Sequence, residues 1–327
     1  MRNIIREVDL SSFLLDNNIY FERNVDLKNK TWIKRGGITN YWVEPKDEHE
    51  LKELAFFLYS SNLFFEIVGH TSNLYFLNTY NPDIVISTRK TNKYNEDCYQ
   101  IICEPGVSIS KLARFCVENG YEGYEGLVDL PGTVAAAVYN NSGCYKCNIS
   151  ELLLKIDLVT PTGKYQSLTP KDLCFKERSS ALKRKELEGI ILKVFLKKQS
   201  SMDKEALINT AKKNKIHRKK YQEKKSANLG SVFPSSIMHK AYKNSPLFFF
   251  LRKIIRYLPI SIIKKQKLTK NIFLIIHGKR GFAKYLSNHS INCFIWKDQG
   301  ADQLFLEYVE FMKKITKTDI TEIEIRD

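Results

Sequence analysis

Six short apolar runs within residues 30–198 are the feature that most limits how this chain can fold. Each run is rich in β-branched or aromatic residues and ends at polar or turn-forming residues, which is typical of β-strands. The six runs are 41–45, 64–70, 83–88, 99–106, 152–163 and 189–198. Between them, residues 47–62 and 108–120 carry apolar residues at helical spacing, and the second pattern runs from a serine cap to a glycine stop. This interleaving predicts an α+β protein.

The character of the chain changes near residue 200. Residues 203–225 form a long basic helical pattern, and the last segment reads as a helix at about 300–315 followed by a strand that carries Glu322 and Glu324. A chain of 327 residues is long enough for two or three separate cores, so we predict two domains. Their bounds are 1–200, with subdomains at about 1–85 and 86–200, and 201–327, with a basic insertion at about 237–272.

Composition and charge restrict the class of protein and its partners. Hydrophobic residues make up 43% of the chain and charged residues 27%, which is ordinary for a soluble globular protein. No run of about 18 apolar residues is present, and charges interrupt residues 1–13 where a signal peptide would have its apolar core. We therefore expect a cytoplasmic protein. The net charge of +16 fits nucleic acid, an anionic membrane surface or an anionic substrate.

Residues 245–270 alternate bulky apolar residues with Lys and Arg, and two interpretations stay open. In the first, the segment lies as a basic amphipathic helix on an anionic membrane, which would make the protein peripheral to the inner face of that membrane. In the second, it packs on its own domain and turns a basic face to water. Pro259 limits any single helix to one side of it.

The seven cysteines show no framework spacing, and their number is odd, so we expect reduced thiols. Cys144 and Cys147 form a single C-x-x-C pair. A zinc site needs a second pair with matched spacing, and the sequence has none, so no metal site is predicted.

Two glycine-containing stretches suggest phosphate binding. In the first, a predicted strand runs into Gly69 and then Thr71, Ser72 and Asn73, whose amides and side chains can surround an anion. An ordinary strand-to-loop turn is the alternative. In the second, residues 130–143 contain a Pro-Gly turn, a threonine cap and three alanines, so a helix would begin with exposed amides. Two such cradles, about 60 residues apart, indicate one extended dinucleotide held at two points.

In this order, the two stretches resemble the flavin-binding motifs of the UDP-N-acetylenolpyruvoylglucosamine reductase (MurB-type) family. That family reads G-G-G-S-N-L at the first and G-I-P-G-T-V-G-G-A-V-x-x-N-A-G-A-Y at the second. The resemblance implies a two-part FAD-binding domain of the PCMH/VAO-like type followed by a smaller α+β substrate domain. It also implies FAD contacts at Gly69, His70, Thr71, Ser72, Asn73, Leu74, Pro131, Gly132, Thr133, Ala135, Ala136, Val138 and Asn141.

Ala135 and Ala136 stand where the family has two glycines. If those positions need a positive φ or very close contact, alanine would be unfavourable. If they lie in an ordinary helix, alanine would stabilise it.

The family's catalytic residues map onto Arg178, Ser231 and Glu324, in the stretches "FKERSSAL", "LGSVFPSS" and "TEIEIR". The resemblance implies that Arg178 stabilises negative charge on an enolpyruvyl substrate, Ser231 donates a proton to its α-carbon and Glu324 orients Arg178. It implies substrate contacts at Arg218, Glu177, Ser180 and Gly230.

These motifs imply an FAD-dependent, NADPH-using reductase of the UDP-N-acetylmuramate dehydrogenase type, which acts on a nucleotide sugar in peptidoglycan and cell wall biosynthesis. An FAD-dependent oxidoreductase acting on another sugar or lipid-linked glycan is the alternative, since Glu177 replaces a tyrosine, the family's K-N-P is missing after Phe233, and the insertion is unusual. The third interpretation is a basic protein that binds a membrane surface without catalysis. No nucleic-acid motif is present, so nucleic acid is not an expected partner.

Overall fold

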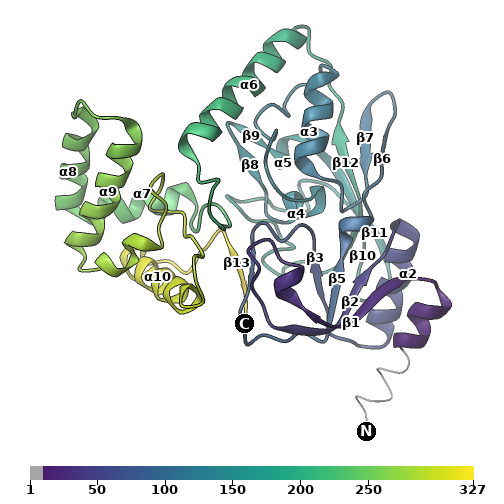
Figure 1. Ribbon diagram of the computed structural model, residues 1–327. Helices are drawn as coiled ribbons and strands as arrows, with labels where there is room; N and C mark the ends of the chain where they lie inside the picture. The colour runs from purple at the N-terminus through teal and green to yellow at the C-terminus, as the bar shows by residue number, and fades with distance from the viewer. Residues whose placement is uncertain (1–9) are drawn as a thin grey trace. The chain divides into compact units, whose positions relative to one another are not determined.

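Figure 1 shows the computed structural model, which describes residues 10–327 and divides into two compact units. The first unit contains the described residues up to Thr31 together with Gly36–Thr71 and Asn78–Lys215; the second contains Trp32–Arg35, Ser72–Leu77 and Ile216–Asp327. Each unit combines helices with strands, and the predicted α+β class is confirmed. The change of unit at Lys215 lies inside helix α6 (Lys204–Tyr221), whereas the sequence placed a domain boundary at residue 200.

One sheet of the first unit has the strand order β1-β2-β5-β3. Its strands are β1 (Tyr20–Asp26), β2 (Ile38–Glu44), β3 (Glu66–Val68) and β5 (Ile84–Ser87), with the short helices η1 (Leu27–Asn29) and η2 (Thr88–Lys90) after β1 and β5. Helix α2 (Glu48–Ser60) is capped by Asp47 and buries its leucines against this sheet. Because β3 pairs parallel with β5, the loop after β3 and helix η2 begin at the same sheet edge.

A second, antiparallel sheet in the first unit has the order β11-β10-β12-β7-β6. Its strands are β6 (Tyr94–Glu96), β7 (Gln100–Cys103), β10 (Leu153–Val159), β11 (Tyr165–Leu168) and β12 (Ile190–Lys197). The other elements here are α3 (Ile109–Glu118), α4 (Val134–Tyr139), α5 (Ile149–Leu152) and the hairpin β8 (Gly143–Cys144) to β9 (Cys147–Asn148). One apolar core joins α3, α4 and α5 to this sheet, so α4 has a fixed position.

The second unit is mainly helical. Its helices are α7 (Ser235–Lys243), α8 (Pro246–Tyr257), α9 (Ile262–Ile276), η3 (Arg280–Lys284) and α10 (Ala301–Thr316). Strand β4 (Leu74–Phe76) pairs in parallel with the last strand, β13 (Glu324–Arg326). The core is rich in aromatic rings, and the Phe294 ring lies 5.1 Å from Trp296 and 5.2 Å from Phe305. Among residues 10–327, no helix has both the length and the apolar composition needed to cross a bilayer.

Candidate functional site

The loop after β3 begins at a glycine that has no room for a side chain. A Cβ at Gly69 would lie 2.5 Å from Thr133 Oγ1 and 2.9 Å from Thr133 Cγ2, which is closer than real side chains approach. Thr71, two residues further on, has a φ of 56° and is buried. The two predicted phosphate-binding stretches are therefore in direct contact within the first unit.

Arg89, in η2, fixes the shape of the Gly69 loop. Its Nε donates to Gly69 O at 3.1 Å, and its Nη2 donates to Lys30 O at 2.7 Å and to Thr71 Oγ1 at 3.4 Å. The guanidinium thus places a positive charge directly beside the loop, where it favours a bound anion. Sequence reasoning missed Arg89. The available signal was a basic residue immediately after the predicted strand 83–88.

The second stretch forms helix α4, which starts at Thr133. Thr133 Oγ1 accepts from the amide of the third helical residue at 3.4 Å. Val134 N donates to Val107 O at 2.8 Å, and Ala135 N donates to Pro105 O at 3.1 Å. The sequence predicted that the amides at this helix start would be exposed to a pyrophosphate. That prediction is wrong, because protein acceptors already occupy them.

Backbone amides without a protein acceptor lie instead in the loop after Gly69 and in the turn that ends at Thr133. Within residues 10–327, the backbone N–H groups of His70, Gly132 and Thr133 donate to no protein acceptor. Backbone N–H groups in a partly buried place need an acceptor, and successive amides suit the oxygens of a phosphate. With the Arg89 charge beside them, these residues fit the diphosphate of a dinucleotide cofactor. The backbone N–H groups that remain available to an anion therefore lie in the loops rather than at the helix start.

Ala135 and Ala136 are ordinary helical residues. Both lie inside α4, and neither is among the residues with positive φ in the described chain. The second of the two alternatives for these positions therefore holds: alanine stabilises a helix here.

Ala135→Gly and Ala136→Gly are each expected to lower the free energy of unfolding by about 1 kcal/mol, because glycine loses more backbone freedom in a helix. Urea unfolding of each variant against the parent chain measures this difference. A glycine variant that is more stable than the parent would show that the backbone at these positions is strained.

His70, next to Gly69 in the first stretch, is half-buried. Burial lowers its pKa below the ordinary value of 6.5, and the positive charges of Arg89 and Lys111 lower it further, while the Gly132 backbone acts in the opposite direction. His70 is therefore neutral near pH 7 and presents one ring donor and one ring acceptor.

His70 should make the protein less stable in mild acid. Its folded-state pKa lies below 6.5, so its contribution to stability is complete above that pH and is lost as the pH falls below it, since the unfolded chain binds the proton more readily. We expect His70→Gln to flatten the fall in unfolding free energy from about pH 6.5 downward. Urea midpoints of both chains across this range test it, and parallel curves would contradict it.

Arg178 occupies the tip of a tight turn. Lys176 N donates to Ser179 O at 2.9 Å, and Ser179 N donates to Lys176 O at 3.1 Å. Arg178 has a φ of 55°, a left-handed conformation that costs a non-glycine residue about 1–2 kcal/mol. Its side chain is half-buried, whereas Glu177 is exposed. Strained backbone of this kind is concentrated at functional sites.

The turn is tied to the end of α4. Ser180 Oγ donates to Tyr139 O at 2.7 Å. Lys183 Nζ donates to Asn140 Oδ1 at 2.7 Å and to Arg178 O at 3.2 Å. These bonds bring the predicted catalytic arginine to the same helix that the second stretch forms. Lys183 was not predicted from the sequence.

Two predicted binding residues cannot contact a ligand through their side chains. Ser180 is fully buried and its hydroxyl is used in the turn, and Val138 is fully buried in the core beneath α4. Asn141 is different. Its Nδ2 donates to Lys176 O at 2.9 Å, but its buried Oδ1 has no hydrogen-bond partner among the described residues. An orphaned buried acceptor of this kind is suited to a donor on a ligand.

In the second unit, the segment of Ser231 lies beside the C-terminal strand. Ser231 is exposed and follows Gly230, which has a φ of 80°. Val232 N donates to Asn292 O at 2.8 Å, and Val232 O accepts from Glu322 N at 2.8 Å. The structure therefore brings the segments of two predicted catalytic residues, Ser231 and Glu324, next to each other.

Glu324 is the first residue of β13 and is fixed by hydrogen bonds to the segment of β4 and within β13. The Glu324 backbone N donates to Asn73 O at 2.9 Å, and the Glu324 side chain accepts from Arg326 Nη2 at 3.0 Å. Asn73 Nδ2 also donates to Glu322 O at 2.9 Å. Ser72 and Leu74 flank Asn73, so these three predicted cofactor contacts belong to the second unit.

Arg218 lies on α6 and is 4% exposed. Its side chain therefore lies in the interior, and its contact with a substrate stays a prediction. Among residues 10–327, no cluster of His, Cys, Asp and Glu has the arrangement of a metal site.

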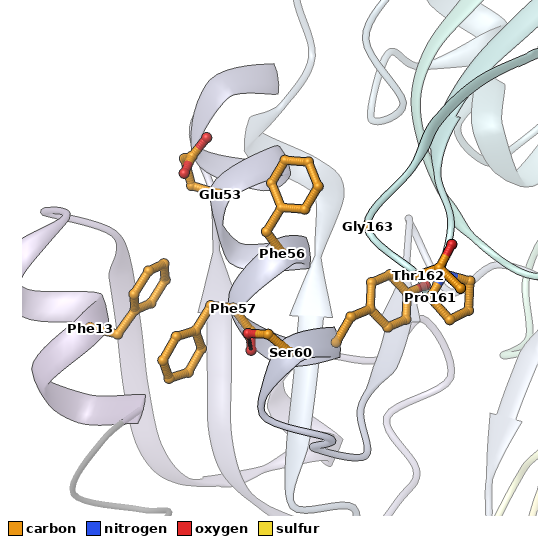
Figure 2. Close-up of a pocket in the computed structure, with 9 residues that line it drawn as sticks. Phe13, Glu53, Phe56, Phe57, Ser60, Pro161, Thr162 and Gly163 are labelled. Atoms are coloured by element: carbon orange, nitrogen blue, oxygen red, sulfur yellow. Dashed lines mark hydrogen bonds between the residues drawn. The ribbon is translucent and has the colours of Figure 1, made fainter.

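Figure 2 shows a separate groove in the first unit, with a cavity volume of about 400 Å³. Phe13 and Phe57 stack at its edge, with ring centroids 4.1 Å apart, and Pro161, Thr162 and Gly163 form its other side. No residue of either phosphate-binding stretch lines it, so it is not a candidate for the cofactor site.

Comparison with protein families identifies the class. The FAD binding domain family matches residues 39–169, a range that contains both stretches and the loop amides. This match identifies the chain as an FAD-binding flavoprotein, and the predicted cofactor FAD is confirmed.

Relatives then identify the family. A UDP-N-acetylenolpyruvoylglucosamine reductase from Caldicellulosiruptor saccharolyticus is 31% identical over 66% of this chain and 69% of its own length. One from Prochlorococcus marinus is 31% identical over 69% of this chain and 78% of its own. The crystal structure of the Thermus caldophilus enzyme shares the fold, with a TM-score of 0.67, 20% identity, and coverage of 94% of this chain and 100% of that one. The chain belongs to the UDP-N-acetylenolpyruvoylglucosamine reductase family, as the motifs predicted, and it is an enzyme of the FAD-dependent oxidoreductase class.

Proposed function

We propose that this protein uses NADPH to reduce the enolpyruvyl ether of a UDP-sugar to a lactyl ether, a step of peptidoglycan precursor synthesis. The observation that carries the proposal is the contact between the two cofactor loops at Gly69 and Thr133, with uncommitted amides on both sides. His70, Gly132, Thr133 and Arg89 would hold the diphosphate of FAD, and Asn141 Oδ1 would accept a donor from the cofactor.

Three side chains would each have a separate role in reduction of the substrate. The bound flavin supplies the hydride that the enol ether accepts. Arg178 stabilises the negative charge that then develops on the α-carbon and its carboxylate. Ser231 transfers its hydroxyl proton to that α-carbon as the general acid. Glu324 orients the cationic partner of the carboxylate and polarises the enol system.

The strained turn at Arg178 supports this assignment. Because Ser180 and Lys183 fix the turn against α4, Arg178 needs little rearrangement to meet the developing charge. Arg218 and Gly230 belong to the second unit and stay proposed substrate contacts; Arg218 is buried on α6.

A second candidate is the same chemistry on another sugar or lipid-linked substrate. The exposed Glu177 favours it, because a carboxylate next to Arg178 replaces the family's tyrosine and would repel an anionic substrate group there. For either substrate, we propose a cytoplasmic enzyme, and we propose contact with the inner face of the membrane through residues 245–270.

Separate half-reactions test the proposal. The purified protein should be yellow and should release FAD on denaturation. Anaerobic NADPH should bleach the flavin, and enolpyruvyl-UDP-N-acetylglucosamine should restore its colour. Bleaching without recovery would favour the second substrate class, and a folded protein with no affinity for FAD would exclude both.

A further inference from the structure

Helix α8 packs through one face and leaves an apolar stripe on the other. Phe248 and Ile255 are buried against the second unit. Apolar residues on the opposite side remain exposed at helical spacing: Leu247 (59%), Phe250 (61%), Ile254 (47%) and Tyr257 (83%). Four large side chains in a row on one helix face form a continuous patch rather than isolated exposed residues.

Exposed apolar residues continue along the sequence past Pro259, and basic side chains lie among them. Ile260 and Ile263 are 37% and 46% exposed at the link to α9. Exposed basic residues accompany these six apolar ones: Lys253, Arg256, Lys264 and Lys267. On α8, Lys253 follows Phe250 by three positions and precedes Tyr257 by four, so it borders the stripe directly. We refer to these ten residues as the α8–α9 face.

The charge around this face has one sign. Residues 224–297 contain fifteen Lys and Arg and no Asp or Glu, so this segment carries fifteen of the sixteen net positive charges of the chain. A second copy of the same face would oppose these charges with like charges, which is unfavourable. The complementary partner is an anionic surface that also accepts apolar side chains.

We propose that the α8–α9 face binds the surface of an anionic lipid bilayer. Its apolar side chains would enter the boundary between headgroups and acyl chains, and its Lys and Arg would lie at the lipid phosphates. Both interpretations of residues 245–270 would then hold, because α8 packs on its own unit and also presents an amphipathic face. It rests on the membrane contact proposed above for residues 245–270 and names the face that makes it. This face lies outside the proposed catalytic residues, so its binding does not depend on the enzyme's substrate.

Cosedimentation of the full chain with vesicles tests the proposal. We expect binding to vesicles of phosphatidylcholine with about 30% phosphatidylglycerol, weak binding to phosphatidylcholine alone, and release by about 0.5 M salt. The double variant Lys253→Glu and Arg256→Glu should weaken vesicle affinity roughly 30-fold or more, because each basic residue near such a surface contributes about a five-fold effect. Phe250→Ser should also weaken it, with the net charge unchanged.

A matched control has the same change of charge elsewhere. Lys212→Glu and Lys213→Glu alter two exposed lysines of α6 and should leave vesicle binding within about 3-fold of the parent. Equal losses in the two double variants, or equal binding to neutral vesicles, would overturn the proposal. Concentration-dependent dimers that Phe250→Ser dissociates, without vesicle binding, would also overturn it and assign the face to a second copy. Circular dichroism of each variant confirms folding.

Discussion

In the Ser231→Ala variant, we expect NADPH to reduce the flavin at the normal rate. Reoxidation of the flavin by enolpyruvyl-UDP-N-acetylglucosamine should be roughly 10²–10⁴-fold slower than in the parent. The reason is that the hydroxyl is required only when the α-carbon of the substrate takes up a proton. The residue is exposed on a segment fixed by the Val232 to Glu322 hydrogen bond, so its removal should not disturb the fold. Stopped-flow absorbance at the flavin band measures the two half-reactions separately.

Ser235→Ala is the control for this experiment. Ser235 is also exposed, four residues further along the chain, and opens helix α7, whose cap makes no side-chain hydrogen bond. Both half-reactions of this variant should match those of the parent. If Ser231→Ala slows reduction by NADPH as much as reoxidation, Ser231 is not the proton donor.

Gly69→Ala is expected to yield protein that has lost most of its FAD. The added Cβ would lie 2.5 Å from Thr133 Oγ1, so the two loops must separate and the amides of His70 and Gly132 can no longer meet one diphosphate. We expect the free energy of unfolding to fall by about 1–3 kcal/mol, and the ratio of bound FAD to protein to fall with it. Absorbance of the purified variant and urea unfolding measure the two effects.

Two further variants separate crowding from a general effect of alanine. Gly281→Ala places a Cβ in open space and should keep FAD and stability. Adding Thr133→Ala to Gly69→Ala removes the two nearest atoms and should recover part of the bound FAD, although the cap of α4 is lost. No recovery in the double variant would mean that Gly69 is needed for a reason other than its contact with Thr133.

Most of the strands that sequence reasoning found lie inside the sheets, as β2, β5, β7, β10 and β12 do, although β3 at a sheet edge and the half-exposed β13 were also found. Strands β5 and β12 read as almost unbroken apolar runs because both of their faces are covered. The edge strands β6 and β11 were missed, since nearly all of their residues are exposed and therefore polar in pattern. Capping residues were predictable because they act locally: Ser108 and Thr133 both accept hydrogen bonds at the helix starts they were expected to cap.

The candidate site was predictable only where its residues form a motif. Arg89 and Lys183 act mainly through backbone carbonyls and an amide oxygen of distant segments, and such bonds leave no pattern in the chain. The amides of α4 were assigned to a ligand because their acceptors, Pro105 and Val107, lie about thirty residues earlier. Ser180 was assigned to substrate binding from its motif, but the residue is fully buried and its hydroxyl donates to Tyr139 O inside the protein.

The parallel pairing of β4 with β13 has a consequence for synthesis of the protein. Strand β4 is translated long before β13. The side chain of Asn73 bonds to Glu322, 249 residues later, and β4 itself pairs with β13, so neither interaction can form until that part of the chain has been made. At about 5–20 residues per second, this delay is roughly 10–50 s. During that time the apolar strand β4 of the nascent chain has no β13 to pair with. A chain stalled before Glu322 would therefore be a substrate for chaperones.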